Sequence, residues 1–223
     1  MTYSVKEMFY TLQGEGAHTG RPAVFCRFTG CNLWSGREAD RATSICTFCD
    51  TDFIGTDGVG GGKFATATEL AEAIAACWPR QSDPAIDSGR RYVVFTGGEP
   101  ALQLTEALIE ALHQRDFECA VESNGTRPLP ENLDWVCISP KGRSEVIIDH
   151  CNELKLVYPQ PDAPPERFAH ISADLRYLSP MNPFAADTLY PAQESSTQAA
   201  IAYCMDHPQW RLTLQSHKII NIA

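Results

Sequence analysis

Long apolar runs and positive charge are both scarce in this 223-residue chain. Nowhere do eighteen apolar residues occur together, and the amino terminus has no basic region followed by an apolar stretch. Only 18 lysines and arginines stand against 28 acidic residues, which gives a net charge of −10. These absences argue against a membrane span, a secretion signal and a nucleic-acid partner. We therefore expect a soluble, cytoplasmic protein that acts on a small molecule.

Disulfides are not indicated, although the chain has nine cysteines. An odd count without a secretion signal argues for a reducing compartment. Six cysteines stand alone in apolar stretches with no second ligand at metal spacing, and we interpret them as packing residues. These six are Cys26, Cys77, Cys119, Cys137, Cys151 and Cys204.

The other three cysteines, Cys31, Cys46 and Cys49, form a C-x14-C-x2-C array just beyond an apolar segment. Three thiolates can hold an iron–sulfur cubane that needs four ligands, which leaves one iron open for chemistry. A structural zinc site would want a fourth ligand, and none is evident at finger-like spacing. The local pattern favours a cluster and leaves zinc as the alternative.

Short apolar runs alternate with helical stretches along the chain, which favours a mainly parallel sheet with crossover helices. We predict strands near residues 23–29, 92–95, 119–121, 135–138, 154–157, 175–178 and 210–214. Helices are indicated by the capping box at Thr66 and Glu69, by the stripe of Leu104, Leu108 and Leu112, and over residues 193–206. No strong linker divides the chain. About six parallel strands with few helices predict an incomplete, open α/β barrel in a single domain over residues 1–223.

Unusual residues follow four of these strands. Cys31 follows the first, the segment Thr96–Pro100 the second, Ser123–Gly125 the third and Ser139–Lys141 the fourth. In α/β barrels the chemistry collects in loops at the carboxyl ends of the strands. We therefore expect the four loops to meet at one mouth.

The segment Gly97-Gly98-Glu99-Pro100 directly follows a strand. Its glycines let backbone approach a ligand closely, and the strand edge offers main-chain groups to an amino acid, although an ordinary turn is an equal alternative. Together with the cysteine triplet, the segment resembles the radical S-adenosylmethionine (SAM) enzymes. In that family three cysteines bind a 4Fe–4S cluster and a GGEP-type segment holds the methionine part of SAM. The usual spacing there is C-x3-C-x2-C, and the first interval here is eleven residues longer.

The longer interval narrows the resemblance. It occurs here with Leu12–Gly16, Cys49–Thr51, Ser139–Lys141, Glu153–Lys155 and Gln215–Lys218. Over nearly its whole length the chain resembles the 7-carboxy-7-deazaguanine synthase family of radical SAM enzymes. This resemblance implies a partial radical-SAM barrel with an enlarged cluster loop at about residues 30–51. It also implies a homodimer and an electron donor such as flavodoxin or ferredoxin.

The reaction implied by the resemblance contracts 6-carboxy-5,6,7,8-tetrahydropterin to 7-carboxy-7-deazaguanine with loss of ammonia, in queuosine and 7-deazapurine biosynthesis. SAM would serve as a reusable cofactor, Mg²⁺ would assist, and no side chain is given a catalytic role because the cofactors carry the chemistry. Two alternatives stay open from the sequence: a radical SAM activase of a glycyl radical enzyme, and a zinc-stabilised binding module.

Site residues follow from the same resemblance. The cluster would be held by Cys31, Cys46 and Cys49, and Mg²⁺ by Thr51, which would otherwise be a plain turn residue. SAM would contact Phe48, Cys49, Asp50, Gly98, Ser139, Pro140 and Lys141. The substrate would contact Leu12, Gln13, Gly14, Arg27, Thr96, Ser179, Pro180, Met181, Asn182, His217 and Ala223.

The assignments of Arg27 and of the segment from Leu178 to Asn182 each depend on a further point. Arg27 lies in an apolar strand, where an unpaired guanidinium is costly, so it needs either the substrate carboxylate or an internal acid such as Glu15. Members of the family commonly have Leu-Gln-Pro-Met-Asp where this chain has Leu178-Ser179-Pro180-Met181-Asn182. We expect the chemistry to survive this departure and the contacts of that loop to differ.

Overall fold

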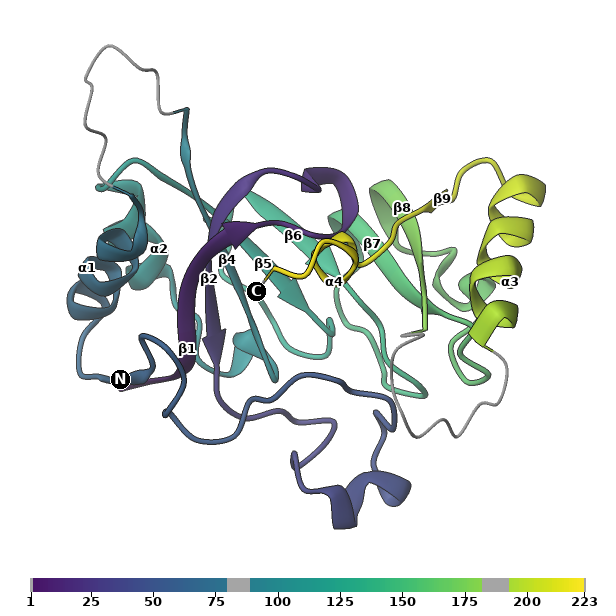
Figure 1. The fold of residues 1–223 in the computed structure, drawn as a ribbon, viewed down its shortest axis with the longest axis horizontal. Coiled ribbons are helices and arrows are strands. Elements are labelled where there is room, and N and C mark those ends of the chain that lie inside the picture. Colours follow the sequence, from purple (N-terminus) through teal and green to yellow (C-terminus); the bar gives the residue numbers. More distant parts are fainter. Residues whose placement is uncertain (1, 80–88, 182–192, 223) are drawn as a thin grey trace.

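The computed structural model describes residues 2–79, 89–181 and 193–222. Within these residues nine strands form one sheet in the order β3-β1-β2-β4-β5-β6-β7-β8-β9 (Figure 1). The strands are β1 Tyr3–Leu12, β2 Pro22–Phe28, β3 Gly62–Phe64, β4 Arg91–Gly97, β5 Phe117–Ser123, β6 Trp135–Ile138, β7 His150–Tyr158, β8 Ser172–Pro180 and β9 Arg211–Leu212. The α-helices are α1 Ala67–Cys77, α2 Glu106–His113, α3 Gln193–Asp206 and α4 Ser216–Ile219. Short 3-10 helices are η1 Gly16–His18, η2 Glu38–Thr43, η3 Pro100–Leu102 and η4 Pro165–Phe168.

Most of the sheet is parallel. From β2 through β9 each neighbouring pair runs parallel, whereas β1 pairs antiparallel with both β2 and β3. The chain is therefore a mixed α/β protein with a mainly parallel sheet and few helices. The predicted strands correspond to β2 and β4–β9, although β9 is shorter than the predicted 210–214.

The sequence analysis missed β1 and β3. Along β1, Val5 and Met8 are both buried, which breaks the alternation expected of a strand. The cause is an irregularity in the pairing with β2 between Val5 and Glu7, which shifts the side chains that follow to the other face. β3 is too short, at three residues, for any period to be visible.

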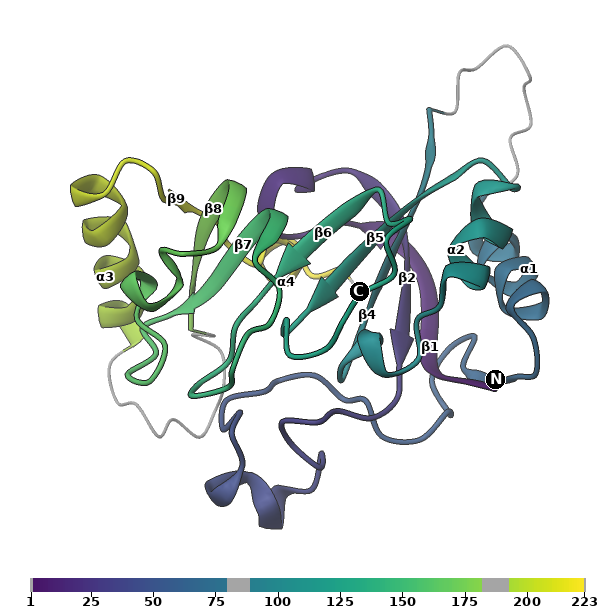
Figure 2. The same ribbon diagram turned by 180° about the vertical axis from the view of Figure 1, so that it is seen from behind.

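Apolar burial on both faces explains the central strands. Tyr92, Val93, Val94 and Phe95 of β4 are each at most 1% exposed, as expected for a parallel strand covered on both sides. Helices α1 and α2 pack side by side at one end of the sheet, and α3 packs at the other end (Figures 1 and 2). The helices thus cover the two ends of the sheet and leave the carboxyl ends of the middle strands to loops.

The helices largely follow the predicted limits. α1 begins with the predicted capping box, since Glu69 N donates to Thr66 Oγ1 at 3.1 Å and Thr66 N donates to Glu69 Oε2 at 3.3 Å. α3 matches the predicted residues 193–206. Leu104 was expected on the second helix but lies before it, because Thr105 caps α2 by accepting from Leu108 N. None of the helices in the described ranges has the length and apolar character to cross a membrane.

Replacing the cap Thr66 with alanine should lower the free energy of unfolding by about 1 kcal/mol, because an amide in the first turn of α1 loses its acceptor. Urea unfolding measures this loss. Thr68→Ala is the matched control, since Thr68 is exposed within α1 and alanine is the better helix former there. Equal losses in the two variants would contradict the capping argument.

Candidate active site

One cavity of about 450 Å³ lies where the loops after the parallel strands meet. The predicted site residues that line it are Leu12, Gln13, Gly14, Arg27, Cys31, Cys46, Phe48, Cys49, Asp50, Thr51, Thr96, Gly98, Ser139, Lys141, Ser179, Pro180 and His217. Pro140 and Met181 are not among the lining residues, and Asn182 and Ala223 lie outside the described residues. The structure brings most of the predicted set together, and their binding roles stay predictions.

The long interval between Cys31 and Cys46 forms a side loop whose two ends meet. The amides of Ile45 and Cys46 donate to the carbonyl of Leu33 at 3.1 and 3.4 Å. Leu33 N in turn donates to Cys31 Sγ at 3.4 Å. The second and third cysteines therefore return beside the first, although many residues separate them along the chain. Figure 1 shows this loop, with η2 at its tip, below the carboxyl end of β2.

Cys46 and Cys49 are neighbouring thiols at the two ends of the C-x2-C turn. The Cys46 thiol donates a hydrogen bond to the Cys49 sulfur and lowers the pKa of Cys49 to about 6, although burial acts in the opposite direction. The same hydrogen bond, together with burial, raises the pKa of Cys46. All nine cysteines are free thiols. Cys49 is thus the more readily ionised member of the pair, as a metal-ligating thiolate requires.

The sulfurs of Cys31, Cys46 and Cys49 do not lie as close together as the ligands of one zinc ion. Within the described ranges, the only three His, Cys, Asp or Glu ligands that lie within 4.8 Å of one another are His113, Cys119 and Asp134. A tetrahedral zinc site needs its sulfurs that close, whereas a cubane binds each thiolate through a different iron. Asp134 Oδ2 already accepts from His113 Nε2 and Cys119 N, both at 2.8 Å, so these three residues form a structural hydrogen-bond network.

The Gly97–Gly98 loop lies in direct contact with the cysteine loop. A Cβ on Gly98 would stand 2.0 Å from the Gly30 carbonyl oxygen and 2.9 Å from Cys31 Cβ. Gly97 has φ +130°, and a Cβ there would stand 2.2 Å from the Phe28 carbonyl oxygen. Only glycine fits this approach of two backbones. The segment is therefore more than an ordinary turn: it places a bare main chain beside Cys31.

Glu99 joins three strand ends, a role that sequence reasoning missed. Its fully buried carboxylate accepts from Ser123 Oγ at 2.7 Å, Asn124 N at 2.8 Å and Ala101 N at 2.9 Å. Burial raises the pKa of Glu99, while these hydrogen bonds act against the rise. Ser139 N donates to the Ser123 carbonyl oxygen at 2.7 Å, which adds the loop after β6. The loops after β4, β5 and β6 are thus fixed relative to one another.

A buried cation, Lys155, forms the opposite wall of the cavity and was also missed as a site residue. Its ammonium lies 2.8 Å from Glu15 Oε2 and 3.1 Å from Glu122 Oε2. Burial alone would lower the pKa of Lys155, but the two carboxylates raise it well above its ordinary value. Burial alone would raise the pKa of Glu15, but Lys155 and the Gln215 amide lower it to about 2. Lys155 and Glu15 are therefore both charged near neutral pH.

Gln13 is held by the same network. Its Nε2 donates to Glu122 Oε1 at 3.0 Å, and its Oε1 accepts from Glu15 N at 3.1 Å. Its backbone N–H and C=O bond to Arg21 O and Gly20 N at 2.8 and 2.7 Å. The orientation of the Gln13 amide is consequently fixed before any ligand arrives.

Arg27 has an internal partner, but it is Glu7 and not Glu15. Its Nε donates to Glu7 Oε1 at 2.8 Å. Among the described residues, its two Nη groups have no hydrogen-bond partner, and the side chain lines the cavity. One edge of the guanidinium is therefore occupied by Glu7, and the other edge is available to an anion.

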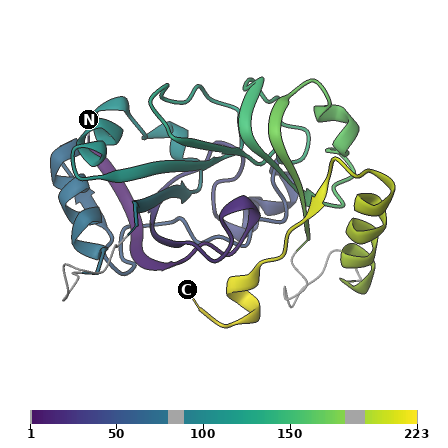
Figure 3. The same ribbon diagram turned by 90° about the horizontal axis from the view of Figure 1, so that it is seen from above.

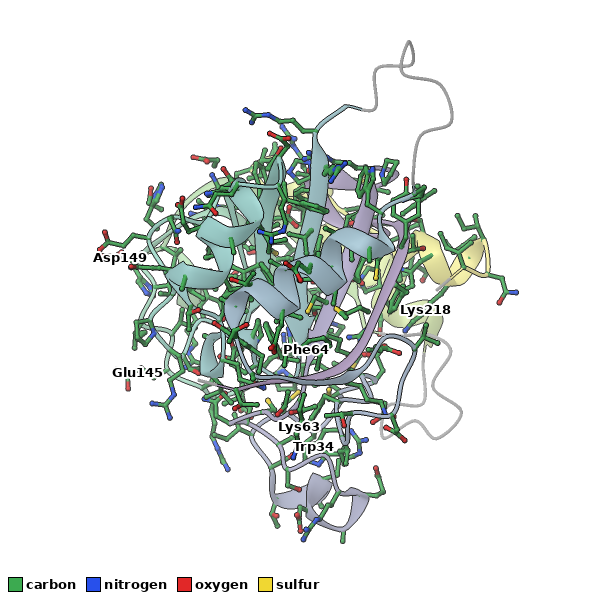
Figure 4. All side chains as sticks on the ribbon, turned by 90° about the vertical axis from the view of Figure 1, so that its left-hand side faces the viewer. Trp34, Lys63, Phe64, Glu145, Asp149 and Lys218 are labelled. Carbon is green, nitrogen blue, oxygen red and sulfur yellow. The ribbon has the colours of Figure 1, made fainter. Side chains whose placement is uncertain are left out.

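Gln215, His217 and Lys218 of the carboxyl-terminal segment line the cavity. Figure 3 shows this segment as it runs from β9 through α4. Ser216 donates from N and Oγ to the Gly14 carbonyl oxygen at 3.0 and 2.8 Å, and Lys218 Nζ lies 2.6 Å from Asp50 Oδ2. A Cβ on Gly14 would stand 2.1 Å from His217 Nδ1, so the imidazole packs against bare backbone. Burial lowers the pKa of His217. Figure 4 labels Lys218 at the end of this segment.

Comparisons with known proteins give one consistent result. A protein of Bordetella pertussis named 7-carboxy-7-deazaguanine synthase is 60% identical over 222 residues, which cover 100% of both chains. The protein of the same name from Burkholderia multivorans is 50% identical over 222 residues, again with 100% of both covered. The crystal structure of QueE from Escherichia coli aligns with TM-score 0.69 at 28% identity, covering 97% of this chain and 95% of that one. No family model matches the chain.

Replacing Gly98 with alanine should lower the free energy of unfolding by about 1–3 kcal/mol, because the new methyl group would overlap the Gly30 carbonyl. Gly62→Ala is the control: its Cβ would meet only the Phe64 ring, at 3.7 Å. We expect less than about 0.5 kcal/mol of change there. Denaturant titration of both variants measures the difference, and a Gly98 variant as stable as the Gly62 variant would contradict the close approach.

The ion pair of Glu15 predicts a pH-dependent stability. The pKa of this carboxyl falls from 4.5 to about 2 on folding, so it stabilises the folded chain above about pH 4.5 and loses this effect as the pH falls through about 2. Glu15→Gln should therefore cost roughly 3 kcal/mol at pH 7 and less than about half of that at pH 3. Urea unfolding at both pH values tests this. The exposed Glu131→Gln is the control, and a cost independent of pH would contradict the assignment.

Proposed function

The chain belongs to the 7-carboxy-7-deazaguanine synthase family, and from this premise we propose how its cavity carries out the family reaction. It is a radical SAM enzyme that forms 7-carboxy-7-deazaguanine. In our proposal the substrate is 6-carboxy-5,6,7,8-tetrahydropterin, ammonia is lost, and the enzyme uses a 4Fe–4S cluster, SAM and Mg²⁺. The observation that carries the proposal is that the cysteine triplet, the Gly98 loop and the Lys155 network line the same cavity.

The residues present fit the cofactors. Cys31, Cys46 and Cys49 line the same cavity and would hold a cubane through three of its irons, with the fourth iron open to SAM. Gly98 lines the cavity beside Cys31 and presents bare main chain there, which suits the methionyl part of SAM. When bound, the reduced cluster and SAM supply the one-electron chemistry that removes a hydrogen atom from the substrate and returns it.

The adenosyl part of SAM is assigned to the two loops that flank the cluster. Phe48 and Asp50 belong to the cysteine loop, and Ser139, Pro140 and Lys141 follow β6. Lys141 Nζ donates to the Ser139 carbonyl oxygen at 2.9 Å and also to Ser139 Oγ. This internal pairing fixes the turn. Pro140 is not in the cavity wall, so in our proposal it shapes the turn, while Ser139 and Lys141 contact SAM.

The pterin is assigned to the wall around Gln13. Glu15, Glu122 and the oriented Gln13 amide present hydrogen-bonding groups at one place, as a flat ring with several N–H groups requires. Leu12, Gly14, Thr96 and His217 line the same cavity, as do Ser179 and Pro180. In this proposal Lys155 keeps the Glu15 carboxylate ionised and therefore able to accept hydrogen bonds.

The carboxylate of the substrate is assigned to Arg27 and Mg²⁺. The unoccupied edge of Arg27 can donate two parallel hydrogen bonds to it. Thr51, in the cavity wall next to Asp50, would bind Mg²⁺ together with the substrate and water, since Mg²⁺ prefers oxygen ligands and keeps several waters. Met181 follows Pro180, which lines the cavity, but does not line it itself. For Asn182 and Ala223, only the resemblance supports a contact with the substrate.

The finer features of the assembly are also proposals. We propose that the sheet is a partial radical-SAM barrel in one domain over residues 1–223, and that two copies form a homodimer. The electron donor would be a flavodoxin or ferredoxin, and the cytoplasm supplies the reducing conditions that a cluster needs. The glycyl-radical activase and the zinc module considered from the sequence receive no support from the relatives, at 50–60% identity over the whole chain.

Anaerobic reconstitution followed by turnover tests the proposal. The wild-type chain should bind about four irons and convert the tetrahydropterin to the deazaguanine. Alanine at Cys31, Cys46 or Cys49 should abolish both the cubane spectrum and turnover. Cys151→Ala, which removes a thiol that is 1% exposed in the core, should keep both. A wild-type protein that binds zinc but no iron, or that carries a cubane and yields no deazaguanine, would refute the proposal.

A further inference from the structure

Arg41 makes a set of contacts that no role described so far requires. It lies in η2, within the long interval, and its side chain is 22% exposed. Nη1 donates to the carbonyl oxygens of Thr47 at 3.2 Å and Cys49 at 3.0 Å. The guanidinium also lies over the Trp34 ring, 4.0 Å from its centroid. One cation therefore contacts both arms of the cysteine loop.

These contacts are more than a surface ion pair. Glu38 accepts from Arg41 Nε with both carboxylate oxygens at 2.8 Å, but Glu38 is 77% exposed, and such a pair contributes little. The carbonyl contacts differ because they fall on the turn that carries two cluster ligands. A guanidinium is suited to this task, since its planar fork can hold two acceptors while its face stacks on an aromatic ring.

The carbonyl of Thr47 controls the direction of the next amide. In a trans peptide the C=O and the following N–H lie in one plane and point in opposite directions. When Arg41 holds the Thr47 carbonyl, the Phe48 N–H is therefore directed away from Arg41. That N–H acts on the Cys46 thiol in the direction that lowers its pKa. The guanidinium thus acts on a cluster ligand through one rigid peptide plane.

The other two sulfurs also contact the backbone of the loop. Cys31 Sγ accepts from Leu33 N at 3.4 Å, and Cys49 Sγ donates to the Thr51 carbonyl oxygen at 3.9 Å. Trp34, which Arg41 covers, is 7% exposed and packs edge-on against Phe53 with 5.6 Å between ring centroids. Figure 4 labels Trp34 between the η2 loop and the sheet. Arg41 therefore joins the segment that supports Cys31 to the turn that carries Cys46 and Cys49.

We propose that Arg41 is a positioning residue that holds the C-x2-C turn in its ligating conformation and raises the reduction potential of the cluster. Both effects have one origin. A hydrogen bond to a ligand sulfur and a nearby positive charge each stabilise the more negative, reduced cluster. This inference rests on the proposed function, because it requires a cluster at the three cysteines.

Three variants separate position from charge. Arg41→Met removes both the donors and the charge. Arg41→Lys keeps the charge but lacks the planar fork. Arg37→Met is the matched control, because it removes one exposed cation from the same loop without touching either carbonyl.

The first measurement is a redox titration of the reconstituted cluster, in which the cluster spectrum reports the reduced fraction. In Arg41→Met the ratio of reduced to oxidised cluster at a fixed potential should fall about tenfold, which is a shift of about 59 mV to more negative potential. Arg41→Lys should shift less, and Arg37→Met should match the wild type. An unchanged potential in Arg41→Met, or an equal shift in Arg37→Met, would overturn the tuning role.

The second measurement uses the protein without its cluster. Alkylation of Cys46 and Cys49, followed by mass spectrometry, should be several-fold faster in Arg41→Met and Arg41→Lys than in the wild type and Arg37→Met. Equal rates would overturn the positioning role. If the wild type takes up no cluster at all, the proposed function fails, and the alkylation rates still decide whether Arg41 holds the turn.

Discussion

The contact between two loop backbones at Gly98 and Gly30 is the constraint on which the rest of the site depends. Glu99 N donates to the Gly30 carbonyl oxygen at 2.8 Å, so the loop after β4 is bonded directly to the loop that carries Cys31. The buried Glu99 carboxylate then extends this bond to the loop after β5. A carboxylate is costly to bury unless both of its oxygens accept hydrogen bonds. The Glu99 carboxylate accepts three. The cysteine loop is thereby fixed to the rigid sheet instead of moving independently.

The opposite wall depends on charge instead of close backbone contact. A chain with a net charge of −10 buries one lysine between two glutamates, and that ammonium offsets the repulsion between Glu15 and Glu122. Removing either partner of such a group leaves an uncompensated charge in the interior. Because Gln13 and Gln215 bond to the same carboxylates, the pair also fixes the polar surface that faces the cavity. The same contacts therefore hold this wall together and set the polar groups that it presents to the cavity.

Sequence reasoning succeeded where a signal is local. The capping box at Thr66, the apolar run of β4 and the residues that follow each strand are all visible in short windows, and each was placed correctly. It failed where the cause is distant. The irregularity in β1 depends on pairing with β2, and Lys155 gains its meaning from carboxylates on other elements. The partner of Arg27, Glu7, was missed for the same reason: Glu7 lies in β1, and the sequence did not show that β1 is the neighbour of β2.

The long interval between the first two cysteines is compatible with the geometry of a short one because the added residues form a closed side loop. Leu33 accepts the amides of Ile45 and Cys46, so the chain returns to within two residues of Cys31 before the C-x2-C turn begins. Extending such a loop from three to fourteen residues costs only about 1 kcal/mol of closure entropy. The stacking of Arg41 on Trp34 and its bonds to the Thr47 and Cys49 carbonyls oppose that cost. The three thiols therefore line one cavity although fourteen residues separate the first two.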